Sequence, residues 1–207
     1  MNIIKLTILF ILILLLSTAC GHKVANQDST GKNIICFGDS LTEGYGAKPG
    51  EDYPSVLSKL LDQPVINAGV SGNTTRQALE RLQSDVLSKD PKLVIVQFGG
   101  NDFFRKIPRN ETRDNLDQIA LKIQEKGAMA AIVGVRIGLL VDEYDEVFKQ
   151  VANNTKCIYI PNIMKDIFNA PAKKSDEIHP NAAGYNIIAQ RVYERINRYL
   201  KNGNQEN

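Results

Sequence analysis

Two side chains that together could cleave an acyl bond lie far apart in this chain of 207 residues. Ser40 stands in CFGDSLTEG, where an apolar run ends at Gly38 and an acid and a hydroxyl follow. The chain has two histidines; His22 is close to the N-terminus, and His179 lies deep in the sequence. A neutral imidazole can take the proton of a serine hydroxyl and return it later. Ser40 and His179 are therefore a candidate nucleophile and base, with an ordinary turn serine as the alternative for Ser40.

His179 lies in SDEIHPN, a stretch that favours a loop at the entrance of a helix. Pro180 disfavours helical geometry at the preceding residue and fits the first turn of a following helix. Asp176, three residues before His179, can fold back to the imidazole and fix its tautomer and orientation. A capping loop with a surface histidine is one alternative, and a metal site on Asp-x-x-His is another. The body of the chain offers no further histidine as a ligand, so we expect no metal.

Acyl transfer from serine also needs hydrogen-bond donors for the negative charge that develops on the carbonyl oxygen. Gly72 in VSGNTT offers an unshielded backbone N–H, and Asn101 in FGGND offers a side-chain amide. Each has a structural alternative, since a glycine can serve a turn with positive φ and an asparagine can cap a helix. These groups follow separate strand-like runs, which argues against coincidence.

Short β-branched runs alternate with helical patterns from residue 33 onward. The strand-like runs are NIICF, PVINAG, KLVIVQFG, MAAIVGV and CIYI. Apolar residues at spacings of three and four between these runs, and after the last one, predict helices buried on one face. Runs that are apolar at nearly every residue predict strands covered on both faces, hence a parallel sheet between helices. In such sheets, sites form where loops leave the carboxyl ends of the strands.

The first twenty residues, MNIIKLTILFILILLLSTAC, differ from the rest in kind. An apolar run from Leu6 to Leu16 fits a signal peptide and is short for a membrane span. LSTAC resembles a bacterial lipobox, so we expect residues 1–19 to be removed and Cys20 to be lipidated. Cleavage by the ordinary signal peptidase and a retained anchor are the alternatives. The expected product is exported and anchored to a membrane on its periplasmic or cell-surface face.

Composition favours one globular domain. Hydrophobic residues make up 43% of the chain and charged residues 23%, and the formal net charge of +2 gives no reason to expect nucleic-acid binding. Residues 20–32 are polar and rich in turn formers, which predicts a flexible tether before a domain over 33–201 and a polar tail over 202–207. Cys36 and Cys157 either pair or stay as small buried hydrophobic side chains.

The stretches FGDSLTEG, GVSGNTT, GGND and DEIHPN, in this order, resemble the four blocks of the SGNH hydrolases, also called the GDSL esterase and lipase family. The resemblance covers about residues 33 to 200. It implies Ser40 as nucleophile, His179 as general base and Asp176 as the group that orients the base. It also implies an oxyanion hole made by the backbone N–H groups of Ser40 and Gly72 and by the Asn101 amide.

We therefore expect one α/β domain, a flavodoxin-like three-layer α/β/α sandwich with about five parallel strands. The expected reaction is hydrolysis of carboxylic esters or thioesters through an acyl-enzyme on Ser40, with no metal or organic cofactor. GDSLTEGYGA, YPSVL and NAGVSGNTT are most similar to the bacterial periplasmic arylesterase, thioesterase and lysophospholipase branch. The expected partners are a small ester or lipid-like substrate and, through the N-terminal lipid, a membrane.

One stretch departs from that branch, which carries a proline-containing loop near PPNYG after the fourth strand. Here the stretch is VRIGLLVDEY. Ile137 and Leu139 within it, with Phe103 and Phe104 after Asn101, are candidates for a wall that binds the acyl chain; packing into the core is the alternative. Two other functions remain open: O-deacetylation of a carbohydrate or cell-wall glycan, and a non-catalytic, membrane-tethered binding lipoprotein.

Overall fold

A single parallel sheet forms the centre of the molecule. The computed structural model describes residues 23–136 and 142–201. Within them the strand order is β2-β1-β3-β4-β5, and every neighbouring pair is parallel. The strands are β1 (Asn33–Gly38), β2 (Val65–Gly69), β3 (Pro91–Gln97), β4 (Met129–Val133) and β5 (Ile158–Ile160). This order is that of flavodoxin-like doubly wound sheets, so the predicted fold class is confirmed.

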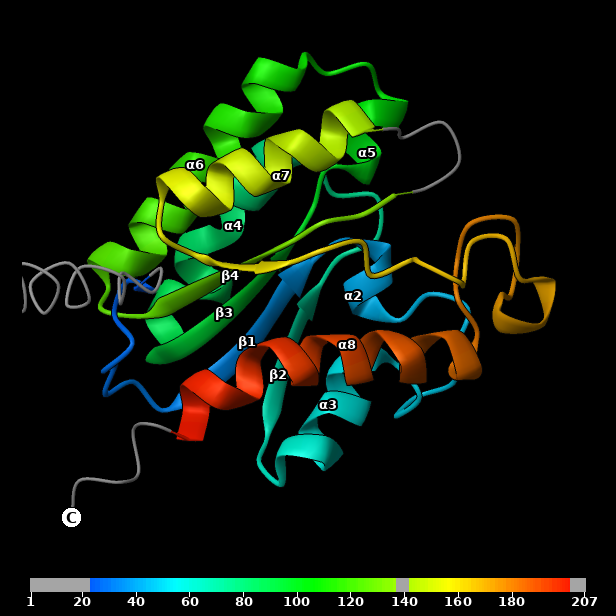
Figure 1. Ribbon diagram of the computed structural model, residues 1–207, viewed down its shortest axis with the longest axis horizontal. Helices are drawn as coiled ribbons and strands as arrows, with labels where there is room; N and C mark the ends of the chain where they lie inside the picture. The colour runs from blue at the N-terminus through cyan, green and yellow to red at the C-terminus, as the bar shows by residue number, and fades with distance from the viewer. Residues whose placement is uncertain (1–22, 137–141, 202–207) are drawn as a thin grey trace, which may run out of the picture.

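Helices cover both faces of the sheet (Figure 1). One face carries α4 (Thr75–Asp85), α6 (Arg109–Glu125) and α7 (Asp142–Asn154). The other carries α3 (Tyr53–Leu61) and α8 (Ala182–Lys201), which pack against each other. The short elements are α2 (Ser40–Glu43), α5 (Gly100–Phe104) and the 3₁₀ turns η1 (Leu87–Lys89) and η2 (Pro171–Lys173).

Burial along the strands follows their place in the sheet. All five residues of β4 and six of the seven in β3 are buried, because helices lie over both faces of these central strands. The edge strand β2 has one buried residue among its five. The apolar character predicted from the sequence is therefore strongest where both faces are covered.

The segment before β1 packs against the domain. Val24 is buried, and the backbone N–H of Ala25 donates to the carbonyl of Lys156 (3.0 Å). The side-chain amide of Asn26 donates to the carbonyls of Gln124 (2.8 Å) and Ala128 (3.1 Å), between the end of α6 and the start of β4. The prediction of a flexible tether over 20–32 is therefore wrong at residues 24–26, which pack on the domain. Composition alone does not show that the Asn26 amide donates hydrogen bonds to two backbone carbonyls of the domain.

Several predictions fall on other residues. The signal peptide (1–19), Cys20 and the tail (202–207) lie outside the described residues. Among those described, no helix combines the length and the apolar character that a bilayer crossing requires.

The two cysteines of the domain do not pair. Cys36 and Cys157 are free and buried. Burial raises the pKa of both thiols, that of Cys157 to about 11, so neither supplies a thiolate near neutral pH.

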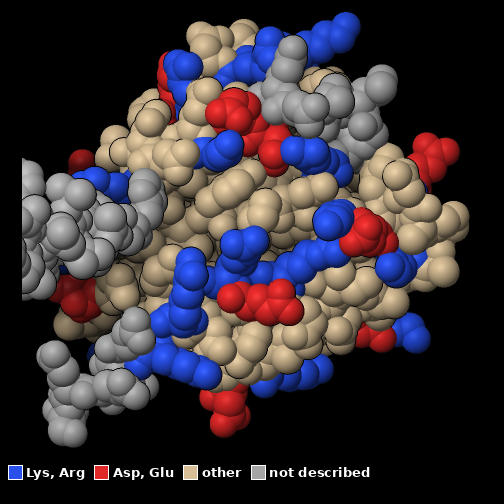
Figure 2. All heavy atoms as spheres, in the orientation of Figure 1, with Lys and Arg blue, Asp and Glu red and all other residues tan. Residues whose placement is uncertain are grey.

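The face that carries α8 has mixed charge. Figure 2 shows Lys and Arg side chains gathered over this helix, with Asp and Glu side chains between them. The last turn of α8 contributes Arg198 and Lys201. Both signs of charge occur on this face, as the nearly balanced composition leads one to expect.

Candidate active site

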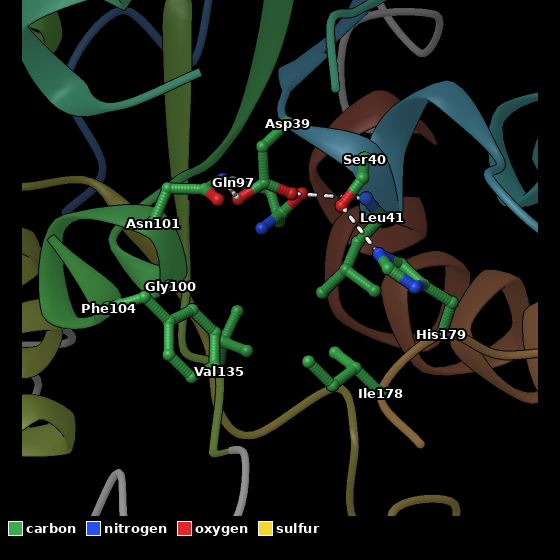
Figure 3. A pocket seen from close by; sticks show the side chains of 10 residues that line it. All are labelled: Asp39, Ser40, Leu41, Gln97, Gly100, Asn101, Phe104, Val135, Ile178 and His179. Atoms are coloured by element: carbon green, nitrogen blue, oxygen red, sulfur yellow. Dashed lines mark hydrogen bonds between the residues drawn. The ribbon is translucent and has the colours of Figure 1, made fainter. Parts of the chain in front are cut away.

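Loops at the carboxyl ends of the strands bring polar side chains to one pocket (Figure 3). Ser40 begins α2 directly after β1, Asn101 lies in α5 after β3, and His179 lies between β5 and α8. The pocket has a volume of about 110 Å³. It is lined by Asp39, Ser40, Leu41, Gln97, Gly100, Asn101, Phe104, Val135, Ile178 and His179.

The turn that presents Ser40 depends on close packing at the end of β1. A Cβ on Gly38 would lie 2.0 Å from the Thr42 hydroxyl oxygen, so only glycine fits there. Asp39 then caps α2, because its carboxylate accepts the backbone N–H of Leu41 at 3.0 Å. The Ser40 side chain points from this turn toward His179 (Figure 3).

Ser40, His179 and Asp176 form a continuous hydrogen-bonded row. The Ser40 Oγ lies 3.0 Å from His179 Nε2, although 139 residues separate them. His179 Nδ1 lies 2.8 Å from Asp176 Oδ2, and Asp176 Oδ1 accepts the backbone N–H groups of Ile178 (2.8 Å) and His179 (2.7 Å). Partial burial favours a higher pKa for Asp176, but these hydrogen bonds and the imidazole outweigh it and lower the pKa to about 2. The carboxylate therefore stays ionised well below neutral pH.

The loop that carries His179 is held at both ends. The backbone N–H of Ser175 donates to the carbonyl of His179 at 2.9 Å, which closes the turn around Asp176. The Asn181 side chain then accepts the backbone N–H groups of Ala183 (3.0 Å) and Gly184 (3.2 Å) at the start of α8. The prediction that His179 lies in a loop at a helix entrance is confirmed.

Asp39 is a second, buried carboxylate beside Ser40. The residue is 3% exposed and lines the pocket. Burial raises its pKa to about 6, although the Leu41 N–H, the neighbouring Gln97 amide and His179 all favour the charged form. Near neutral pH the folded protein thus keeps a charge on Asp39 that its buried surroundings disfavour.

The amide of Asn101 is already engaged. Its Nδ2 donates to the backbone carbonyl of Asn73 at 3.1 Å and to Asp39 Oδ2 at a longer 3.3 Å. Gly72 precedes Asn73 and has φ of +77°, and its carbonyl accepts the Arg105 guanidinium at 3.0 Å. Asn101 lines the pocket, whereas Gly72 is not among the described residues that do.

The candidates for an acyl-binding wall separate into three groups. Phe104 lines the pocket and is 51% exposed. Phe103 does not line it in the described part of the chain; its ring packs against Phe104 and Tyr144, with centroids 5.6 and 5.7 Å apart. Ile137 and Leu139 lie outside the described residues.

Other side chains at the pocket were missed from the sequence. Leu41, Gln97, Val135 and Ile178 line it, and the Tyr45 ring packs on the His179 imidazole with centroids 4.5 Å apart. All but Tyr45 lie within three residues of a strand end or next to His179. Position relative to strand ends was therefore an available signal.

Over the two described ranges, no group of three or more His, Cys, Asp or Glu side chains is arranged to hold a metal ion.

A model of the GDSL-like lipase/acylhydrolase family matches residues 36–187. The chain belongs to this GDSL-like family. Esterase TesA of Pseudomonas aeruginosa is 25% identical over 90% of this chain and 98% of its own length. Thioesterase 1/protease 1/lysophospholipase L1 of Escherichia coli K12 is 26% identical over 79% of this chain and 82% of its own length.

Further similarity supports the same chemistry. Acetylxylan esterase of Geobacillus stearothermophilus is 26% identical over 81% of this chain and 94% of its own length. The crystal structure of esterase EstA from Pseudoalteromonas sp., inhibited by monoethylphosphonate, has a TM-score of 0.74 and 27% identity over 82% of this chain and 98% of that one. This member of the GDSL-like family is a carboxylic ester hydrolase.

The raised pKa of Asp39 predicts a pH-dependent cost to folding. The unfolded chain releases this proton at lower pH than the folded protein does, so the contribution of Asp39 to stability falls between about pH 4 and 6. Asp39→Asn removes the buried charge, and we expect the free energy of unfolding near neutral pH to rise by about 1–3 kcal/mol. Urea denaturation at neutral pH and at about pH 4 measures the difference.

The stabilisation should shrink at about pH 4, where Asp39 is protonated in the folded protein and partly protonated in the unfolded chain. Asp62→Asn, at an exposed helix end, serves as the control and should change stability by less than about 0.5 kcal/mol at either pH. An Asp39→Asn protein that is less stable than wild type at neutral pH would contradict the prediction.

Proposed function

We propose that Ser40 is the nucleophile of an acyl-enzyme mechanism, with His179 as general base and Asp176 as the group that orients it. The contacts of 3.0 and 2.8 Å along this row carry the proposal. Because Asp176 is ionised, the imidazole donates Nδ1–H to it and leaves Nε2 to accept the Ser40 proton. His179 then gives this proton to the leaving alcohol or thiol, and later activates the water that hydrolyses acyl-Ser40.

In this mechanism the oxyanion is held by the backbone N–H groups of Ser40 and Gly72 and by the Asn101 amide. Asn101 keeps its hydrogen bond to the Asn73 carbonyl and releases the longer one to Asp39 when substrate arrives. One N–H thereby turns toward the developing charge while the other holds the amide in place.

The pocket supports a short acyl chain as the preferred group. The part of it that the described residues line has a volume of about 110 Å³, small beside the roughly 300–1,000 Å³ of sites that bury drug-sized ligands. Apolar side chains of Leu41, Phe104, Val135 and Ile178 form much of its lining, which suits hydrocarbon better than a sugar. We therefore propose short-chain esters or thioesters as substrates.

The first test is removal of the reacting groups. Ser40→Ala and His179→Ala should each lower kcat for p-nitrophenyl butyrate by at least about 10³-fold, while thermal unfolding stays close to wild type. An alkyl phosphonate should label wild type on Ser40, as detected by peptide mass spectrometry. A Ser40→Ala protein with near wild-type kcat would contradict the mechanism. A well-folded wild type that neither hydrolyses esters nor accepts the phosphonate would instead favour a non-catalytic binding lipoprotein.

A substrate series separates the proposal from O-deacetylation, which the similarity to an acetylxylan esterase favours as second candidate. We expect kcat/KM to be highest for p-nitrophenyl esters and acyl-CoAs of short chain and to fall as the chain lengthens. Acetylated xylo-oligosaccharides, assayed by acetate release, should be poorer substrates. A clear preference for the acetylated sugars over p-nitrophenyl butyrate would make deacetylation the function.

We also propose that the protein is exported and carries a lipid on Cys20, on the strength of the leader sequence. Cells fed a radioactive fatty acid should yield a labelled protein in the membrane fraction. The control variant Cys20→Ala should lose both the label and the membrane association. An unlabelled wild type released in soluble form would instead indicate cleavage by the ordinary signal peptidase.

A further inference from the structure

Arg81 is a charged residue on the inner face of α4. Its side chain is 15% exposed, and its guanidinium donates in three directions. It reaches the Gly38 carbonyl at the end of β1 (2.8 Å), the Ala68 carbonyl in β2 (2.9 Å) and the Asn73 Oδ1 in the following loop (2.7 Å). One side chain thus joins two strand ends and a loop.

The guanidinium is held in place by packing and by one ion pair. Its central carbon lies 4.4 Å from the centroid of the Phe37 ring and 5.7 Å from that of Phe98. Asp85, one helical turn along α4, accepts a further hydrogen bond at 2.8 Å. Few of its rotamers can satisfy these contacts together, so the group is pre-organised.

Each strand or loop that Arg81 contacts leads into the candidate active site. Gly38 precedes Asp39 and Ser40, and the backbone carbonyl of Asn73 accepts the Asn101 amide at 3.1 Å. Arg81 therefore touches the turn that presents the nucleophile and the residue that anchors the amide.

We propose that Arg81 is a positioning residue for ester hydrolysis, which sets the Asn101 amide through Asn73 and aligns it with the Ser40 turn; this role rests on the proposed function. Arg81 itself touches neither substrate nor the reacting atoms. A misplacement of about 1 Å in a catalytic constellation can cost on the order of 10²-fold in rate, so its effect appears in kcat.

Lysine cannot replace arginine here. The planar guanidinium satisfies four acceptors in fixed directions and stacks on a ring, whereas an ammonium has three donors around one point. Arg81→Lys thus keeps the positive charge but loses the planar arrangement of donors that contacts all four acceptors.

The test is steady-state kinetics with p-nitrophenyl butyrate, accompanied by thermal unfolding and a crystal structure of Arg81→Lys. We expect Arg81→Lys to lower kcat about 10–100-fold, with KM within about 3-fold of wild type and the Asn101 amide displaced from the Asn73 carbonyl. Asn73→Ala, which cuts one contact and leaves Arg81 in place, should lower kcat in the same direction. It serves as the second variant if Arg81→Lys does not fold.

One variant is expected to leave kcat near wild type. Arg76→Lys is the matched control, because Arg76 lies on the same helix, is 58% exposed and pairs with Glu111 away from the pocket.

A double mutant tests whether Arg81 acts through Asn101. Asn101→Ala alone should lower kcat about 10²–10³-fold, the range for one oxyanion donor. Adding Arg81→Lys to Asn101→Ala should then lower kcat by a clearly smaller factor than Arg81→Lys does in the wild-type protein. The positioning role would be overturned if the two losses of kcat multiplied fully in the double mutant. A change confined to KM would also overturn it, as would an unaltered kcat in folded Arg81→Lys and Asn73→Ala.

The structural measurement separates this inference from the proposed function. If wild type hydrolyses no ester, the proposed function fails, and the crystal structure of Arg81→Lys still decides the positioning. An Asn101 amide unmoved in that structure would show that Arg81 does not set it.

Discussion

A hydrogen bond between side chains 139 residues apart, Ser40 and His179, is the contact on which the rest of the site depends. A parallel sheet makes it possible, because all strands point the same way and their carboxyl ends share one edge. The turn after β1 and the loop before α8 both lie at this edge, and the Ser40 and His179 side chains point toward each other there (Figure 3). The central strands β3 and β4 are buried between helices, so their carboxyl ends are supported by packing on both faces of the sheet.

Two charged side chains near this contact, those of Asp39 and Arg81, are largely buried, and their burial lowers the stability of the fold. Asp39 keeps a carboxylate in a site that raises its pKa, and Arg81 keeps a guanidinium beneath the same strand ends. Hydrogen bonds to backbone carbonyls and to Asn73 offset the burial of Arg81. Buried networks of this kind stabilise a unique arrangement only when their members find partners. The fold is thus less stable than one with apolar side chains at these positions, and in exchange a few polar atoms are held in place.

Much of the fold and of the site follows from patterns in the sequence. Continuous apolar runs predict the five strands, and the order of the stretches around Ser40, Gly72, Asn101 and His179 predicts which loops meet. The contacts of Arg81 were missed, although its place on the stripe with Ala78 and Leu82 marks a charge on an inward-facing helix position. Spacing cannot give the state of Asn101, whose amide is engaged by Asp39 and Asn73, since that depends on tertiary distances. Nor does polarity predict that residues 24–26 pack on the domain, because this packing depends on one buried valine and one side-chain amide.

The acyl-enzyme is an obligatory species of the proposed mechanism and can be observed directly. Protein mixed with a short-chain ester and quenched in acid during turnover can be digested and analysed by mass spectrometry. We predict an added acyl mass on the peptide that contains Ser40, and no acylated peptide from Ser40→Ala. An acyl group on another residue during measurable turnover would contradict this mechanism. Wild-type turnover by Ser40→Ala would contradict it as well.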